Sequence, residues 1–392
     1  MTVEGLPPGI LDGVRVVELA QNAAIPHCGR LLAGLGADVV KVEPPEGDAL
    51  RHIAQVAELE GKAYVVINPG KRSIVLDLQR PEARPVVDAL FTWADIALVA
   101  FKSDDLARYG IDWDHAKTVN PRLIHLTHSA LGPEGPDAHH GGYDVLVQGR
   151  SGLGWVMNRS GRTAPRPTRP AINDFSTGFV SAFAVLAALR HRDQTGEGQR
   201  VDTSLLGTAM SLATPIVARF PGDDDALDEL DEDLVALRAA GVSFDEQRTH
   251  YEARVEAAEG VFQLYFRHYQ TADGIISVAA LSPGLFQKFH QITGLGPPEV
   301  RDVSGPSFQQ LVQDAEALFA SRTSAEWLEK LGAGGYPCGP YNLPHEAIHD
   351  PQVVANDFVV ELEHPTFGPY TTSGMPVRFE KAPAKIPGPS PR

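Results

Sequence analysis

The sequence predicts an α/β protein with a parallel sheet in a large domain and a second, smaller α/β domain. Short apolar segments rich in β-branched residues alternate with helical patterns between residues 14 and 126. Such alternation is typical of a parallel sheet with helices on both faces. The chain has 392 residues, enough for two domains, and its apolar fraction of 43% allows a sizeable core.

The expected elements of the large domain follow in order along the chain. Strands are predicted at Val14–Leu19, Asp38–Val42, Ser73–Leu78, Ile96–Val99 and Leu123–Leu126, and helices at Pro26–Leu35 and Pro81–Trp93. Gly36 is expected to end the first helix, because glycine readily adopts the left-handed conformation found after helix ends. No Gly-x-Gly-x-x-Gly pattern follows the first strand, which disfavours NAD as a cofactor.

The composition changes after Pro215. The segment Asp223–Asp233 contains eight acidic residues and no basic residue, which favours a solvated, mobile loop or linker. A strand at 274–280 and a helix at 326–331 then suggest a smaller domain. We therefore expect a large domain over 1–219, a small domain with the acidic linker over 220–330, and a C-terminal segment over 331–392 that returns to the large domain.

Charge and composition exclude several classes of protein. The net charge of −16 disfavours partners such as nucleic acid or an anionic membrane surface. The sequence shows no apolar run of membrane-spanning length and no secretory signal at its start. Two distant cysteines make neither a disulfide framework nor a metal site, and the adjacent His139 and His140 are interpreted as a surface loop. We expect a soluble cytoplasmic protein without a metal.

Asp174 is the main candidate for chemistry. It precedes the apolar run Phe179–Leu189, which has the length and composition of a buried helix. An aspartate at this place lies near a helix N-terminus, where backbone N–H groups and the helix dipole favour an anion. Most such residues only cap the helix, but a carboxylate held there can also act as a nucleophile.

The surrounding motifs resemble the class III (CaiB/BaiF-type) CoA-transferase family. The core of the resemblance is Gly142-Tyr143-Asp144, then Ile172–Gly178 with Asp174, then His191–Leu205. Further matching segments are Leu11–Leu19, Leu31–Pro44, Lys71–Leu78 and Pro376–Phe379. The resemblance implies a large Rossmann-like CoA-binding domain and an interlocked homodimer.

The resemblance also implies an activity, acyl-CoA:carboxylate CoA-transfer, with acyl-CoA and a carboxylic acid as substrates. Asp174 takes the place of the family nucleophile, which forms an aspartyl anhydride and then an aspartyl-CoA thioester. A 2-methylacyl-CoA racemase or isomerase of the same fold and a non-catalytic CoA-binding protein are the alternatives. Racemases of this fold carry a histidine where this chain has Tyr143.

Further residues are candidates for binding CoA. Two of them, Gln21 and Asn22, follow the first strand, where α/β sheets place ligand loops. The others are given by family position or lie beside such positions: Lys71, Arg72, Lys102, Arg108, Tyr143, Asp144 and Gly260. The cations could equally be solvated surface charges, and Asp144 could be a simple cap. Gly260 stands alone where many family members have a run of glycines, so it could be an ordinary turn residue.

Overall fold

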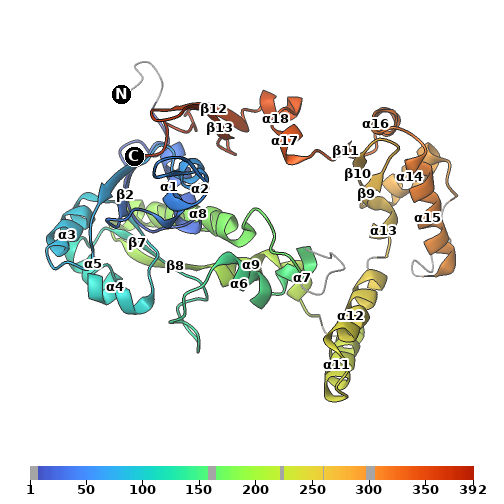
Figure 1. Cartoon of the computed structure of the whole chain (residues 1–392), viewed down its shortest axis with the longest axis horizontal. Helices are drawn as coiled ribbons and strands as arrows, with labels where there is room; N and C mark the ends of the chain where they lie inside the picture. Colours follow the sequence, from blue (N-terminus) through green and yellow to red (C-terminus); the bar gives the residue numbers. More distant parts are fainter. Residues whose placement is uncertain (1–7, 158–164, 221–224, 259, 297–304) are drawn as a thin grey trace. The chain divides into compact units, whose positions relative to one another are not determined.

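The computed structural model divides the chain into two compact units (Figure 1). Unit 1 comprises Met1–Ala218 and Pro351–Arg392, and unit 2 comprises Arg219–Asp350. The structure describes residues 8–157, 165–220, 225–258, 260–296 and 305–392. The chain thus returns to the large unit at Pro351, twenty residues later than the predicted boundary at 331.

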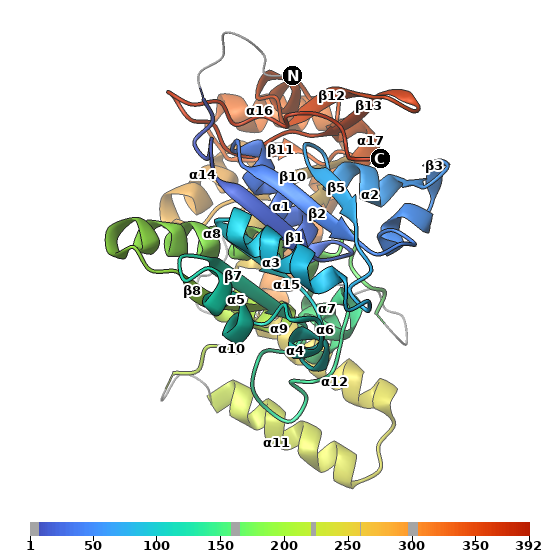
Figure 2. The ribbon, with the colours of Figure 1, turned by 90° about the vertical axis from the view of Figure 1, so that its left-hand side faces the viewer.

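A parallel sheet forms the centre of unit 1, as the sequence predicted, and it has a sixth strand at 199–204 beyond the five expected. Its strand order is β5-β2-β1-β6-β7-β8, so the chain proceeds outwards from β1 in one direction and then, after a crossover, in the other (Figure 2). The strands are β1 (Arg15–Leu19), β2 (Asp38–Glu43), β5 (Arg72–Val75), β6 (Ile96–Val99), β7 (Ile124–Ser129) and β8 (Gln199–Ser204).

Helices cover both faces of this sheet. On one face α1 (Ala24–Gly34) and α8 (Ile172–Thr195) pack on Val16, Val39 and Leu126, and on the other α3 (Ala83–Trp93) and α5 (Trp113–Val119) pack on Val17 and Val99. Consecutive residues such as Val16 and Val17 enter opposite cores because side chains alternate along a strand. Buried apolar residues on both faces explain why these strands read as continuous apolar runs.

Shorter elements complete unit 1. They are η1 (Ala49–His52), β3 (Gln55–Ala57), β4 (Glu60–Gly61), α2 (Lys62–Ile67), α4 (Ser103–Tyr109), α6 (Asp144–Arg150), α7 (Leu153–Met157), α9 (Leu205–Leu212), α10 (Thr214–Val217), α18 (Pro351–Ala355), β12 (Val359–His364) and β13 (Gly368–Ser373). The C-terminal residues are extended, as predicted, and are tied to the unit by backbone hydrogen bonds from Lys385 to Gly34 and from Gly70 to Pro389.

Unit 2 has its own core around a three-stranded antiparallel sheet. The strands are β9 (Phe266–Gln270), β10 (Ile275–Ala279) and β11 (Cys338–Pro340), in the order β11-β10-β9. Its helices are α11 (Asp225–Ala239), α12 (Phe244–Ala258), α13 (Phe262–Tyr265), α14 (Pro283–Thr293), α15 (Pro306–Ala320), α16 (Ser324–Ala333) and α17 (Pro344–Ala347). The pairing of β11 with β10 explains why this unit continues beyond residue 330.

The acidic segment is not the predicted loop. From Asp225 onwards it belongs to α11, which packs against α12. Leu230 of α11 is buried, while Asp228 and Glu229 beside it are exposed. Repulsion between the carboxylates is weak because they lie on a solvated face of the helix. Leucines at 230, 234 and 237 form an apolar stripe, and the helix buries this side. Residues 223 and 224 lie outside the described part of the chain.

The helix α8 corrects a second expectation. With 24 residues, it is long and apolar enough to cross a membrane by length and composition, whereas the sequence analysis saw no such stretch. The apolar run Phe179–Leu189 is short, but the helix extends beyond it at both ends. A core helix of a globular domain meets the same criterion, and α8 packs on α1, β7 and β8.

Candidate active site

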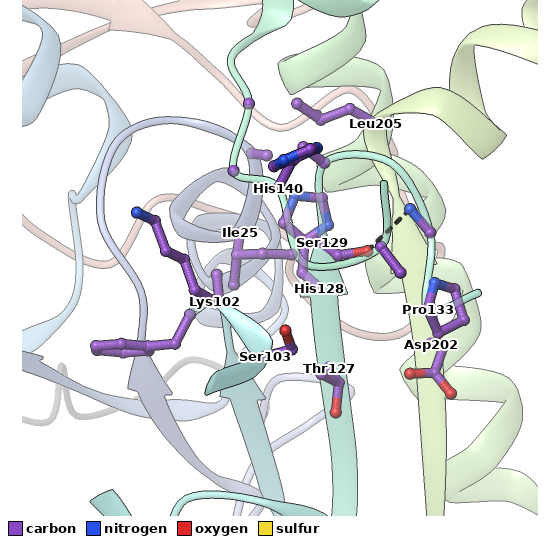
Figure 3. A pocket seen from close by; sticks show the side chains of 18 of the residues that line it. Ile25, Lys102, Ser103, Thr127, His128, Ser129, Pro133, His140, Asp202 and Leu205 are labelled. Atoms are coloured by element: carbon purple, nitrogen blue, oxygen red, sulfur yellow. Dashed lines mark hydrogen bonds between the residues drawn. The ribbon is translucent and has the colours of Figure 1, made fainter. Parts of the chain in front are cut away.

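A cleft of about 740 Å³ opens in unit 1 where β1, β6 and β7 end. It is lined by residues 21–25 after β1, by 100–103 after β6 and by 127–130 at the end of β7. The order of the strands reverses between β1 and β6, and open α/β sheets bind ligands at such a switch point. In Figure 3, Lys102 and Asp202 lie on opposite sides of His128 and Ser129, which come from β7.

Asp174 lines this cleft from the first turn of α8. Burial, and next the nearby charge of Asp144, raise the pKa of Asp174 from 3.8 to about 6. The carboxyl group is therefore mainly ionised at neutral pH, yet it is more basic than a solvated aspartate. A raised pKa in a cleft is typical of a functional carboxylate, and a more basic carboxylate is a better nucleophile.

Asp144 fixes the start of α8. Its Oδ2 accepts hydrogen bonds from the backbone N–H groups of Asn173, at 2.7 Å, and of Asp174, at 3.2 Å. The residue before the helix, Ala171, has no side chain that could cap it. Asp144, the first residue of α6, thus caps α8 from a distant position in the sequence. The side-chain amide of Gln148 donates a further hydrogen bond to Asp144. This arrangement positions the backbone of Asp174.

Helices α1 and α8 approach closely beside the cleft. A Cβ atom at Gly178 would lie 2.9 Å from the carbonyl oxygen of Ala24 and 2.6 Å from the ring of His27, so only glycine fits without a shift. The His27 ring lies edge-on to Phe175 and Phe179, with centroid distances of 5.0 and 4.9 Å. Burial lowers the pKa of His27 to about 3, so this histidine is neutral at physiological pH. The contact joins the first turn of α1, which follows the loop after β1, to the helix of Asp174.

Comparison with known proteins identifies the family. Residues 11–392 match the model of CoA-transferase family III. The chain belongs to this family. It is 31% identical over 402 residues to a succinate–glutarate CoA-transferase of Agrobacterium fabrum, with 98% of this chain and 93% of that protein covered. It is 28% identical over 398 residues to a formyl-CoA:oxalate CoA-transferase of Streptomyces avermitilis, covering 96% and 91%.

Solved structures agree with the family III assignment. The crystal structure of Rv3272 from Mycobacterium tuberculosis matches with a TM-score of 0.78 at 26% identity, covering 98% of this chain and 97% of that chain. A CaiB/BaiF family protein from Brucella suis matches with a TM-score of 0.74 at 27% identity, covering 98% and 97%. The protein is therefore a CoA-transferase with a family III fold, and its substrates include CoA esters.

The structure brings several predicted site residues of this family III CoA-transferase together. Gln21, Asn22, Lys102 and Tyr143 line the same cleft as Asp174. Asn22 has a φ of 65°, in the left-handed region, so the loop after β1 turns sharply at this residue. Asp144 lies behind Asp174 and is buried, so it acts through the backbone of α8.

Of the other predicted residues in unit 1, Lys71, Arg72 and Arg108 do not line the cleft in the described part of the chain. Lys71 is buried, and its ammonium group donates to Glu18 and to two other acceptors, which disagrees with a direct contact to CoA. Arg72 forms an exposed ion pair with Asp38, at 2.6 Å, and Arg108 lies 3.5 Å from Asp105. Gly260 belongs to unit 2, and its part in CoA binding stays a prediction.

The sequence analysis missed several polar residues of the cleft. Thr127, His128 and Ser129 line it from the end of β7. The position of polar residues directly after an apolar strand could have indicated them. His139 and His140 also line the cleft, so the loop that carries them is part of the site. Among the described residues, no group of three or more His, Cys, Asp or Glu side chains could hold a metal ion.

Proposed function

We propose that this CoA-transferase moves CoA from an acyl-CoA donor to a carboxylic acid through covalent intermediates on Asp174. The observation that carries the proposal is the Asp174 carboxylate, which lines the cleft from the first turn of α8 and has a pKa raised to about 6. Within the described ranges the carboxylate oxygens of Asp174 accept no hydrogen bond from the protein, so both oxygens are available to a substrate.

Each proposed step exchanges one bond for another. An Asp174 oxygen attacks the thioester carbonyl carbon, the C–S bond breaks, and a mixed anhydride and the CoA thiolate result. The thiolate then attacks the side-chain carbonyl of Asp174, which releases the donor acid and leaves an aspartyl-CoA thioester. The acceptor carboxylate reverses both steps and regenerates the Asp174 carboxylate. No proton is consumed, and the energy of the thioester is conserved.

The relatives suggest the class of acid. The curated relatives are named for succinate and glutarate and for formyl-CoA and oxalate. We infer that this protein also uses small carboxylic acids, with CoA as the only cofactor, and that it works as a homodimer in the cytoplasm. Exposed apolar residues of α8, Phe179, Val180 and Phe183, give one face on which a second chain could pack.

An exchange assay tests the proposal. Isotopically labelled acid is incubated with its unlabelled CoA ester, and label should enter the ester with wild-type protein but not with Asp174→Asn or Asp174→Ala. Asp114→Asn is the matched control, because Asp114 lies in the first turn of α5 on the other face of the sheet. Exchange at a substantial rate in either Asp174 variant would refute the mechanism.

The same assay in D₂O separates transfer from racemisation. A racemase must remove and return a proton at the α-carbon, which needs a base on each side of that carbon. This chain has Tyr143 at the position where racemases of this fold carry a histidine, so that histidine cannot serve as one of the two bases. With a 2-methylacyl-CoA we expect CoA transfer and no deuterium at the α-carbon. Deuterium uptake without an added acid would establish racemisation, and tight CoA binding without either reaction would indicate a non-catalytic protein.

A further inference from the structure

The loop between β1 and α1 lies over a set of buried charges. This loop and the first turn of α1 contribute residues 21–25 to the cleft wall. Beside it lie Glu18, Lys41, Asp48 and Lys71, which we call the buried charge cluster. All four are buried, and the side chains of Glu18, Lys41 and Lys71 are 0% exposed. Two cations and two anions balance, so the cluster carries no net charge.

Lys41 holds the beginning of the loop. Its Nζ donates to the carbonyl oxygen of Ala20, at 2.6 Å, directly after β1. The same ammonium lies 3.1 Å from Oε1 of Glu18 and 2.9 Å from Oδ2 of Asp48. Asp48 in turn accepts, through Oδ1, the backbone N–H of Asn22 at 3.4 Å. The cluster therefore contacts the loop at Ala20 and again at the left-handed residue Asn22.

Lys71 holds the first turn of α1, which follows the loop. Its Nζ donates to the carbonyl oxygen of Pro26, at 2.7 Å, to Oε2 of Glu18, at 2.8 Å, and to Oδ1 of Asn68, at 2.8 Å. These three acceptors use all three N–H donors of the ammonium group. A Cβ atom at Gly29 would collide with Glu18 and lie 3.2 Å from Cε of Lys71, so α1 packs tightly on this pair.

We propose that Lys41 and Lys71 are positioning residues, which hold the β1–α1 loop and the first turn of α1 in the conformation that binds acyl-CoA in the cleft. The inference rests on the proposed function, because it takes the cleft as the acyl-CoA site. Buried ion pairs stabilise a fold little, since desolvation of the ions offsets their attraction. The cluster contacts the β1–α1 loop at Ala20 and Asn22 and the first turn of α1 at Pro26, and the residues between these points line the cleft, so the cluster has a role in the shape of the site.

The titration of Lys71 gives this role a pH dependence. Burial lowers the pKa of Lys71 from 10.5 to about 8, while Glu18 opposes that shift. The groups that face it are Glu18 from β1, Lys41 from β2, Asp48, and Cys28 and His27 from α1. Above pH 8 the neutral amine has two N–H donors for three acceptors, so one contact is lost.

The contribution of Lys71 to the stability of the fold changes with pH in the opposite direction to its contribution to binding. Because the folded pKa of Lys71 lies below the unfolded value, the unfolded chain binds more protons between pH 8 and 10.5, and this group raises stability as pH increases there. Binding of acyl-CoA should therefore weaken above pH 8 while the contribution of Lys71 to stability does not fall. If Lys71 had a purely structural role, acyl-CoA binding would not weaken in a pH range where the contribution of Lys71 to stability is maintained.

Direct binding of acyl-CoA by calorimetry between pH 7 and 9.5 tests the inference, with kcat and KM measured in parallel. For Lys71→Met we expect the dissociation constant and KM to rise by about tenfold to a hundredfold, with a smaller change in kcat. Wild-type binding should weaken with a midpoint near pH 8, and Lys71→Arg should shift this midpoint upwards, because arginine stays charged.

Arg192→Met is the matched control. Arg192 is also buried and lies 3.1 Å from Oδ1 of Asp95, but neither residue lines the cleft. This variant should lose stability yet keep the affinity and pH dependence of wild type. If Lys71→Met does not fold, the inference is still tested by comparing wild type with Lys71→Arg, through the pH midpoint of acyl-CoA binding. Binding that is constant from pH 7 to 9.5, or an unchanged midpoint in Lys71→Arg, would overturn the inference. Since binding needs no chemical step, failed exchange with intact binding would instead count against the proposed function.

Discussion

The substitution Asp174→Asn should stabilise the protein while it abolishes activity. The pKa of the Asp174 carboxyl is 3.8 in a solvated chain and about 6 in the folded protein. The folded state thus disfavours the ionised form, mainly because of burial and next because of Asp144. At about 1.36 kcal/mol for each unit of pKa, ionised Asp174 costs roughly 3 kcal/mol of folding free energy at neutral pH. A neutral asparagine of the same shape removes this cost.

The decisive assay measures how the gain in unfolding free energy of Asp174→Asn, relative to wild type, depends on pH. Because the folded pKa is raised, the cost is complete above pH 6 and disappears as pH falls below 3.8. The gain from Asp174→Asn should decrease from about 3 kcal/mol at pH 7.5 to about 1 kcal/mol at pH 4.5. Thermal unfolding at pH 7.5 should show Tm higher by roughly 6 °C in a unit of this size. The reasoning is refuted if the variant is less stable at pH 7.5, or if its gain does not change with pH.

Three further predictions concern the surroundings of Asp174 and the acidic segment. The kcat/KM of wild type should fall below about pH 6 as Asp174 is protonated, and Asp144→Asn should move this limb to lower pH and reduce kcat, which a pH–rate profile measures. Gly178→Ala should reduce kcat/KM by about tenfold or more, because its Cβ pushes α8 away from His27, whereas an unchanged rate would show that the close contact is not needed. Neutralising the four exposed carboxylates at 228–232 should leave turnover within a few-fold, since exposed charges are screened over about 8 Å, and a large loss in a folded variant would contradict this.

The parallel sheet could be predicted from the sequence because its signal is local. Strands such as Ile96–Val99 are short, apolar and flanked by helical patterns, and the structure places this strand at the predicted residues. The helix of Asp174 shows the limit of this reasoning. Its cap, Asp144, lies thirty residues earlier in the chain, so a local pattern gives no sign that α8 begins at Ile172.

Charged residues were the least predictable part of the site. Lys71 and Arg72 are adjacent and both were expected to bind CoA, yet Lys71 is buried against Glu18 and Arg72 is exposed beside Asp38. Lys71 directly precedes β5 and Arg72 begins it, and the partner that each side chain meets is set by tertiary packing, which a local pattern does not show. In the acidic segment the charge suggested a loop, while the apolar stripe that favours a helix was present in the sequence and was overlooked.

The central claim is that Asp174 becomes covalently attached to CoA. The most direct measurement is peptide mass spectrometry of the wild-type enzyme after rapid quenching with acyl-CoA at slightly acidic pH. We expect the peptide that contains Asp174 to gain the mass of CoA less one water, and we expect no such adduct in Asp174→Asn. An adduct on a different residue, or turnover without any adduct on this peptide, would contradict the account.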